Sequence, residues 1–98
     1  MKTWRIVYDP QALDDLDDIH DWVARHAGPR IADSYEQRIV RFVSRLRNFP
    51  NRGQHRDDAA DGVRVIGFEE RVDIAYRLKD DEVQIVRILY AGRQFGAN

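Results

Sequence analysis

The residues near the carboxyl end of the chain have side chains that could do chemistry. Tyr90 closes an apolar run, and Arg93, Gln94 and Phe95 follow it within the segment YAGRQF. A tyrosine can donate a proton and an arginine can bind phosphate, so this end suits a nuclease. Aromatic and arginine side chains also carry most of the energy at protein interfaces. The segment therefore equally suits a surface that binds another protein, or the plain end of a sheet.

A ribonuclease that uses the 2′-hydroxyl of its substrate needs a proton acceptor, a proton donor and cations beside the phosphate. By residue type, the further candidates are His55, Glu69, Glu70 and Arg71. His55 lies in a segment without hydrophobic periodicity, and a lone histidine in such a loop is more often solvated than catalytic. The residues alone therefore leave both chemistry and binding open.

Other reactive sites are poorly supported. The carboxylates of Asp14, Asp18 and Asp21 fall on one helical face, where we expect them to be solvated and not to hold a metal. Segment 56–62, RDDAADG, lacks the ligand spacing of a calcium loop. The chain contains no cysteine and no glycine-rich phosphate loop. We therefore expect no metal and no cofactor.

Length and charge limit the class of protein. A chain of 98 residues builds one domain, 1–98. The net charge of −1 argues against direct binding of nucleic acid, which usually needs a strong positive excess. No apolar stretch approaches the ~20 residues that span a bilayer. We therefore expect a protein of the cytoplasm that does not enter a membrane.

Two helices are predicted in the first half of the chain. After Asp9 and Pro10, a good helix start, an apolar stripe recurs at spacings of three and four residues: Leu13, Leu16, Ile19, Trp22 and Val23. Gly28 and Pro29 end this helix and begin the next. The second stripe is Ala32, Tyr35, Ile39, Phe42, Val43 and Leu46. Arg38, Arg41 and Arg45 lie on another face of this helix.

Strands are predicted at both ends of the chain. Segments 3–9, 62–68, 71–79 and 82–90 alternate apolar and polar residues, whereas 54–62 is predicted to be a loop. In 82–90, Val86, Ile88 and Tyr90 would share one face. Both faces of that strand are largely apolar, so we place it inside the sheet. A buried arginine needs a partner, and Asp73 is one possible partner for Arg87. The expected fold is α+β, in the order β-α-α-β-β-β, with a two-helix hairpin on one face of a mostly antiparallel sheet.

Several segments carry a family likeness: ALDDLDDIHDWVA at 12–24, YEQRIVRFVSRLRNFPNRGQ at 35–54, RVDIAYRL at 71–78 and VQIVRILYAGRQ at 83–94. In combination they resemble the RelE/ParE superfamily of toxins from type II toxin-antitoxin systems. The similarity runs from about Trp4 to Gln94, and the nearer branch is ParE. This resemblance implies a toxin that poisons DNA gyrase and is neutralised by a ParD-like antitoxin with a ribbon-helix-helix DNA-binding part.

The resemblance also implies two binding sites and a hetero-oligomer with the antitoxin, in which DNA binding belongs to the antitoxin. We expect the target to contact Tyr90, Arg93, Gln94 and Phe95. The residues expected to contact the antitoxin are Trp22, Arg38, Arg41, Arg45 and Arg64.

One alternative within the superfamily is a ribosome-dependent mRNA endonuclease of RelE type. Against it, Asp73 stands where such nucleases carry a phosphate-binding arginine, and the chain has only two lysines, Lys2 and Lys79. Another alternative is a member that binds its antitoxin but is not toxic.

Overall fold

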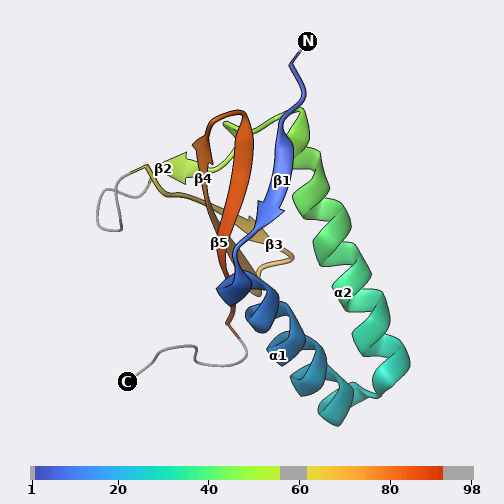
Figure 1. Ribbon diagram of the computed structural model, residues 1–98. Coiled ribbons are helices and arrows are strands. Elements are labelled where there is room, and N and C mark those ends of the chain that lie inside the picture. Colours follow the sequence, from blue (N-terminus) through green and yellow to red (C-terminus); the bar gives the residue numbers. More distant parts are fainter. Residues whose placement is uncertain (1, 56–61, 92–98) are drawn as a thin grey trace.

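The computed structural model describes residues 2–55 and 62–91 of the chain (Figure 1). The helices cover one face of a five-stranded sheet with the strand order β1-β5-β4-β3-β2. The elements are β1 (Arg5–Tyr8), α1 (Pro10–Ala27), α2 (Pro29–Ser44), the 3-10 turn η1 (Arg45–Arg47), β2 (Gln54–His55), β3 (Arg64–Phe68), β4 (Val72–Lys79) and β5 (Glu82–Tyr90).

The predicted α+β fold is confirmed, including the helix hairpin and the internal position of the last strand. β1 pairs with β5 in parallel, and the other neighbouring strands pair in antiparallel fashion. One element was missed. Gln54 and His55, predicted as part of a loop, pair with Val65 and Arg64 of β3. Two residues carry no alternating pattern, so periodicity could not detect this strand.

The helix boundaries follow the predicted start and stop residues. Asp9 precedes α1 and Pro10 is its first residue, although the Asp9 side chain makes no capping hydrogen bond. Gly28 separates the helices with φ at 98°, a conformation that glycine adopts without strain, and Pro29 begins α2. The hairpin geometry therefore depends on this glycine-proline pair.

The buried face of α1 differs from the predicted stripe in one turn. Leu13 is 49% exposed, whereas Ala12 and Asp15 are buried beside Leu16. Ala12, Leu16, Ile19 and Val23 repeat every three to four residues, which is the period of the buried face. Leu13 was the wrong choice in the first turn, because Ala12 continues the buried period and Asp15 lies on the same buried face.

β5 contains an irregularity that changes which side chains face the core. Tyr76 pairs with Ile85, but Ala75 pairs with Arg87, so Val86 is an extra residue in β5. Such a bulge shifts the alternation by one residue. Ile85 before the bulge and Ile88 after it are consequently both buried. The predicted grouping of Val86 with Ile88 and Tyr90 was therefore wrong for Val86.

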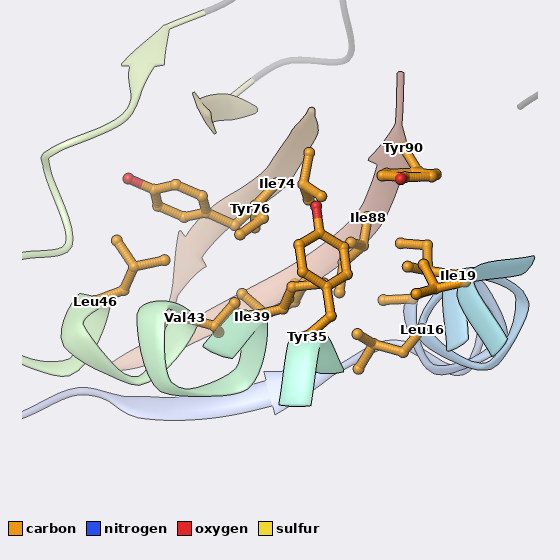
Figure 2. Close-up of a cluster of buried hydrophobic side chains, with 14 of the residues drawn as sticks. Leu16, Ile19, Tyr35, Ile39, Val43, Leu46, Ile74, Tyr76, Ile88 and Tyr90 are labelled. Atoms are coloured by element: carbon orange, nitrogen blue, oxygen red, sulfur yellow. The ribbon is translucent and has the colours of Figure 1, made fainter. Parts of the chain in front are cut away.

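The helix stripes and β4 form one core. Figure 2 shows Ile39 and Val43 of α2 directed toward Ile74 and Ile88 of the sheet. These four side chains are fully buried. The predicted stripe of α2 is confirmed, since its apolar residues are either buried or packed against this core.

The β3–β4 and β4–β5 hairpins turn through residues with positive φ. Asp80 and Asp81 have φ of 54° and 65° between β4 and β5, as a two-residue hairpin requires. Glu69 and Glu70 have φ of 51° and 62° between β3 and β4. The second turn lies beside the end of β5, because Val72 of β4 pairs with Tyr90. Its side chains therefore border the candidate site.

Candidate partner-binding site

An ion pair fixes the end of β5 to α1. Both carboxylate oxygens of Asp15 accept hydrogen bonds from the guanidinium of Arg87, at 2.8 and 3.0 Å. One of them also accepts the backbone N–H of Ile88 at 2.8 Å. β1 stops pairing at Ile85, so beyond that point Asp15 supplies the acceptor that a neighbouring strand would supply. The suggested pairing of Arg87 with Asp73 was wrong, because the guanidinium binds the buried carboxylate of Asp15.

Tyr90, a predicted target contact, belongs to the core. Its side chain is only 7% exposed. Its ring forms T-shaped pairs with the rings of Trp22 and Tyr35, with 5.3 and 6.0 Å between the centroids. Figure 2 shows the Tyr90 ring edge-on beside β5. Tyr90 thus offers little surface to a partner and instead supports the place where β5 ends.

Trp22 remains partly accessible, as a binding residue requires. Its ring stacks on His26 at 3.9 Å and is half-buried. Arg64, by contrast, is engaged inside the chain, where its guanidinium donates to the carbonyl of Gly53 at 3.0 Å. Of these two expected antitoxin contacts, the structure presents Trp22 and uses Arg64 to hold the segment before β2.

The other three arginines expected to contact an antitoxin lie together. We call the hollow they border the arginine groove; its volume is about 210 Å³ and it is lined by Arg38, Arg41, Phe42, Arg45, Phe68 and Glu69. Phe42 and Phe68 pack with centroids 4.9 Å apart and form its apolar part. Arg38 bonds to the carboxylate of Glu69 at 2.8 Å, while Arg41 and Arg45 are exposed. The groove thus combines positive charge with an aromatic floor.

Of the nuclease candidates named from the sequence, Glu69 and Arg71 border one hollow with Tyr90, but the Tyr90 side chain itself is only 7% exposed. The aromatic rings that contact Tyr90 are those of Trp22 and Tyr35. Both residues belong to the apolar stripes predicted for the two helices. His55 is exposed on the edge strand β2, and strands β3 and β4 lie between it and β5 in the sheet. Arg93, Gln94 and Phe95 lie outside the described residues, so their placement as target contacts stays a prediction.

Within residues 2–55 and 62–91, no three carboxylate or imidazole side chains converge as ligands for a metal ion. Neither α1 nor α2 combines the length and the apolar composition that crossing a membrane requires.

Comparison with known proteins identifies the family. Residues 6–95 match the model of the ParE toxin of the type II toxin-antitoxin system parDE. The chain belongs to this family. It is also 31% identical over 85 residues to Toxin ParE3 of Caulobacter vibrioides, covering 87% of this chain and 84% of that protein. The predicted superfamily and its ParE branch are thereby confirmed, and the chain is a toxin of type II toxin-antitoxin class.

Solved structures agree with this ParE assignment. A chain from the chromosomal ParDE toxin-antitoxin system of P. aeruginosa superposes with a TM-score of 0.80 at 31% identity, covering 90% of this chain and 96% of that one. The RelBE2 complex of Mycobacterium tuberculosis gives a TM-score of 0.61 at 21% identity, covering 90% and 98% of the two chains. At that lower identity, the likeness concerns the fold alone.

Proposed function

We propose that this ParE-family toxin inhibits bacterial growth by binding DNA gyrase in the cytoplasm, without cutting RNA. The observation that carries the proposal is the chemistry of the described surface. Tyr90 is enclosed by aromatic rings, and Asp73 exposes a carboxylate where RNA cleavage would call for a cation beside the phosphate. A binding protein needs no acid-base set, only a shaped surface with a few strong contacts.

The target-binding segment in this proposal is Arg93, Gln94 and Phe95. These residues follow β5 by only a few positions, and β5 is held on both sides near its end. Asp15 binds Arg87 and the Ile88 amide, while Trp22 and Tyr35 pack on Tyr90. A rigid strand end lowers the entropy lost when an attached segment binds its target.

The partner in this proposal is a ParD-like ribbon-helix-helix antitoxin that binds the arginine groove. An amphipathic helix can lay apolar side chains against Phe42 and Phe68. Acidic residues on the same helix would meet Arg41 and Arg45, which are exposed and form no ion pair with any of the described residues. Contact with nucleic acid then belongs to the antitoxin of the complex.

Two assays on the purified toxin test the proposed activity. The toxin should inhibit supercoiling by gyrase and leave mRNA intact during translation. Intact supercoiling together with cleaved mRNA would instead establish the RelE-type activity. If both substrates are unaffected and cells grow normally while expressing the toxin without its antitoxin, the chain binds a partner but is not toxic.

A further inference from the structure

The turn between β3 and β4 lies beside the point where β5 ends. A hollow of about 400 Å³, which we call the turn hollow, is lined by Glu69, Glu70 and Arg71 of this turn and by Ala91, the first residue after β5. The Ala91 N–H donates to the carbonyl of Arg71 at 2.6 Å. The turn is therefore attached to the residue from which the chain continues into the proposed target-binding segment.

This turn carries side chains that its backbone does not favour. Glu69 and Glu70 have φ of 51° and 62°, and the β4–β5 turn places Asp80 and Asp81 at similar angles of 54° and 65°. Glycine, asparagine and aspartate tolerate this left-handed region best, so the aspartates suit their turn and the glutamates do not. Residues held at such positions are concentrated at functional sites. The strained glutamates are therefore candidates for a binding role.

Two charges of this turn are open to a partner. Glu69 is bonded to Arg38 at 2.8 Å, so its charge is already countered. Glu70 and Arg71 are exposed, and neither forms an ion pair with another of the described residues. The turn hollow thus presents one anion and one cation side by side, on a backbone that the contacts with Arg38 and Ala91 hold in place.

The proposed target-binding segment, residues 93–95, is too small to form an interface alone. A specific protein–protein interface takes up about 800 Å² on each partner, contributed by about 20–30 residues. Two residues span at most about 7 Å of chain, so a protein that binds Arg93 stands next to Ala91. Because Ala91 lines the turn hollow, such a protein would also cover Glu70 and Arg71.

We propose that the β3–β4 turn is a second part of the target-binding surface, in which Glu70 pairs with a cation and Arg71 with a carboxylate of the bound gyrase. The inference rests on the proposed function and deepens it, because it names contacts for the same target outside residues 93–95. Charge pairs across an interface contribute more to specificity and register than to raw affinity. Glu70 and Arg71 would therefore fix the orientation of the target beside the segment.

Glu70→Asn separates this binding role from a structural one. Asparagine adopts a positive φ more readily than glutamate and carries no charge, so the melting temperature of the isolated chain should stay the same or rise. The dissociation constant for gyrase should rise about 2- to 10-fold, because one charge pair is lost. Arg71→Gln should weaken binding by a similar factor, and both effects should shrink as salt rises, because ions screen exposed charges.

A charge-swapped variant, Glu70→Arg combined with Arg71→Glu, gives the sharpest contrast. It keeps the net charge of −1, so a change in the overall charge of the chain does not explain its behaviour. Each new charge would face a group of its own sign on the target. Binding of gyrase should therefore weaken more than in either single variant.

The β4–β5 turn provides matched controls at the other end of β5 (Figure 1). Asp80→Asn introduces the same residue at a φ of 54°, and Lys79→Gln removes one exposed cation. Both controls should bind gyrase as the unmodified chain does. The affinity of every variant for the antitoxin encoded by the adjacent gene should stay nearly unchanged, since the turn hollow shares only Glu69 with the arginine groove.

Surface plasmon resonance with purified gyrase and the full chain provides the test, with inhibition of supercoiling as the functional assay and calorimetric titration for the antitoxin. Weaker binding of gyrase in the turn variants, with both controls and the antitoxin unaffected, is the expected result. If the unmodified chain neither binds nor inhibits gyrase, the proposed function fails and this inference fails with it.

Three results would overturn the inference while leaving the proposed function standing. One is unchanged binding of gyrase in Glu70→Asn, Arg71→Gln and the charge-swapped variant, together with a loss of binding in Arg93→Ala. Another is an equal loss of affinity for gyrase and for the antitoxin, which would assign the turn to the antitoxin. The last is a lower melting temperature in Glu70→Asn, because the Glu70 side chain would then serve the fold.

Discussion

Asp15 of α1 and Arg87 of β5 form a two-point ion pair across the helix-sheet interface. Asp15 is 3% exposed and also accepts the Ile88 N–H, so one carboxylate satisfies a cation and a strand amide. The hydrogen bond from Asp15 raises the pKa of Arg87, consistent with a guanidinium that stays charged. This arrangement joins the first helix to the strand that leads into the proposed target-binding segment.

Asp15→Asn should lower the free energy of unfolding by about 2–4 kcal/mol, because a half-buried guanidinium loses its counter-charge. Denaturant unfolding of the isolated chain measures the change. Asp14→Asn is the control, since Asp14 is exposed on the same helix and should shift stability by less than ~0.5 kcal/mol. Equal stability of the two variants would show that the ion pair contributes little.

Local periodicity predicted much of the fold, whereas contacts between distant residues could not be predicted. The stripe through Ile39 and Val43 repeats within one helix, so residues close together in the sequence were sufficient to predict it. Asp15 stands in an acidic run and looks like a surface residue, because its partner Arg87 is 72 positions away. The bulge at Val86 has no glycine or proline to mark it, so the phase of β5 beyond it could not be predicted.

The candidate site was predicted less completely for the same reason. Arg38, Arg41 and Arg45 share a helical face, so their spacing predicted their grouping. Phe68 and Glu69 complete the groove from the end of β3 and the following turn. Tyr35 was assigned to core packing by its helical period, and only the three-dimensional arrangement shows that its hydroxyl has no hydrogen-bond partner among the described residues.

Gly53→Ala should destabilise the chain, because an added Cβ would lie 2.7 Å from the hydroxyl of Tyr76. That hydroxyl accepts the Gly53 N–H at 2.8 Å and donates to the Pro50 carbonyl at 2.7 Å, so it has little room to move. We expect a loss of about 1–3 kcal/mol in the free energy of unfolding. Thermal unfolding or denaturant unfolding can measure it.

Gly67→Ala is the matched control for this close approach. A Cβ at that position would lie 3.6 Å from the nearest atom, the Oδ1 of Asp73, which is ordinary contact. This variant should be as stable as the unmodified chain or slightly more stable, since alanine restricts the unfolded state. Similar losses in both glycine variants would contradict the steric explanation.

His20 should titrate above its ordinary pKa of 6.5, because its ring bonds to the Asp33 carboxylate at 2.6 Å. A pKa raised by folding means that the pair stabilises the hairpin fully below about pH 6.5 and loses this contribution as pH rises through the folded-state pKa. NMR titration of the imidazole measures the shift. In Asp33→Asn the pKa of His20 should fall back toward 6.5, and an unchanged value would rule out Asp33 as the cause.

Arg93→Ala should abolish growth inhibition, because an arginine is the strongest single anchor available in the proposed target-binding segment. Growth after expression without the antitoxin is the measurement, with supercoiling by gyrase as the direct assay. Antitoxin affinity should be nearly unchanged, which would show that the variant is folded. Full toxicity of this variant would remove Arg93 from the target contacts.

Arg41→Gln should weaken binding of the antitoxin, since it removes one exposed charge from the arginine groove and leaves Phe42 in place. We expect the dissociation constant to rise about 2- to 10-fold near 0.05 M salt, with a smaller effect at 0.5 M as ions screen the charge. Arg25→Gln removes the same charge from the end of α1, outside the groove, and should change the affinity less. If both variants weaken binding equally, the antitoxin responds to the overall charge of the toxin and not to the groove.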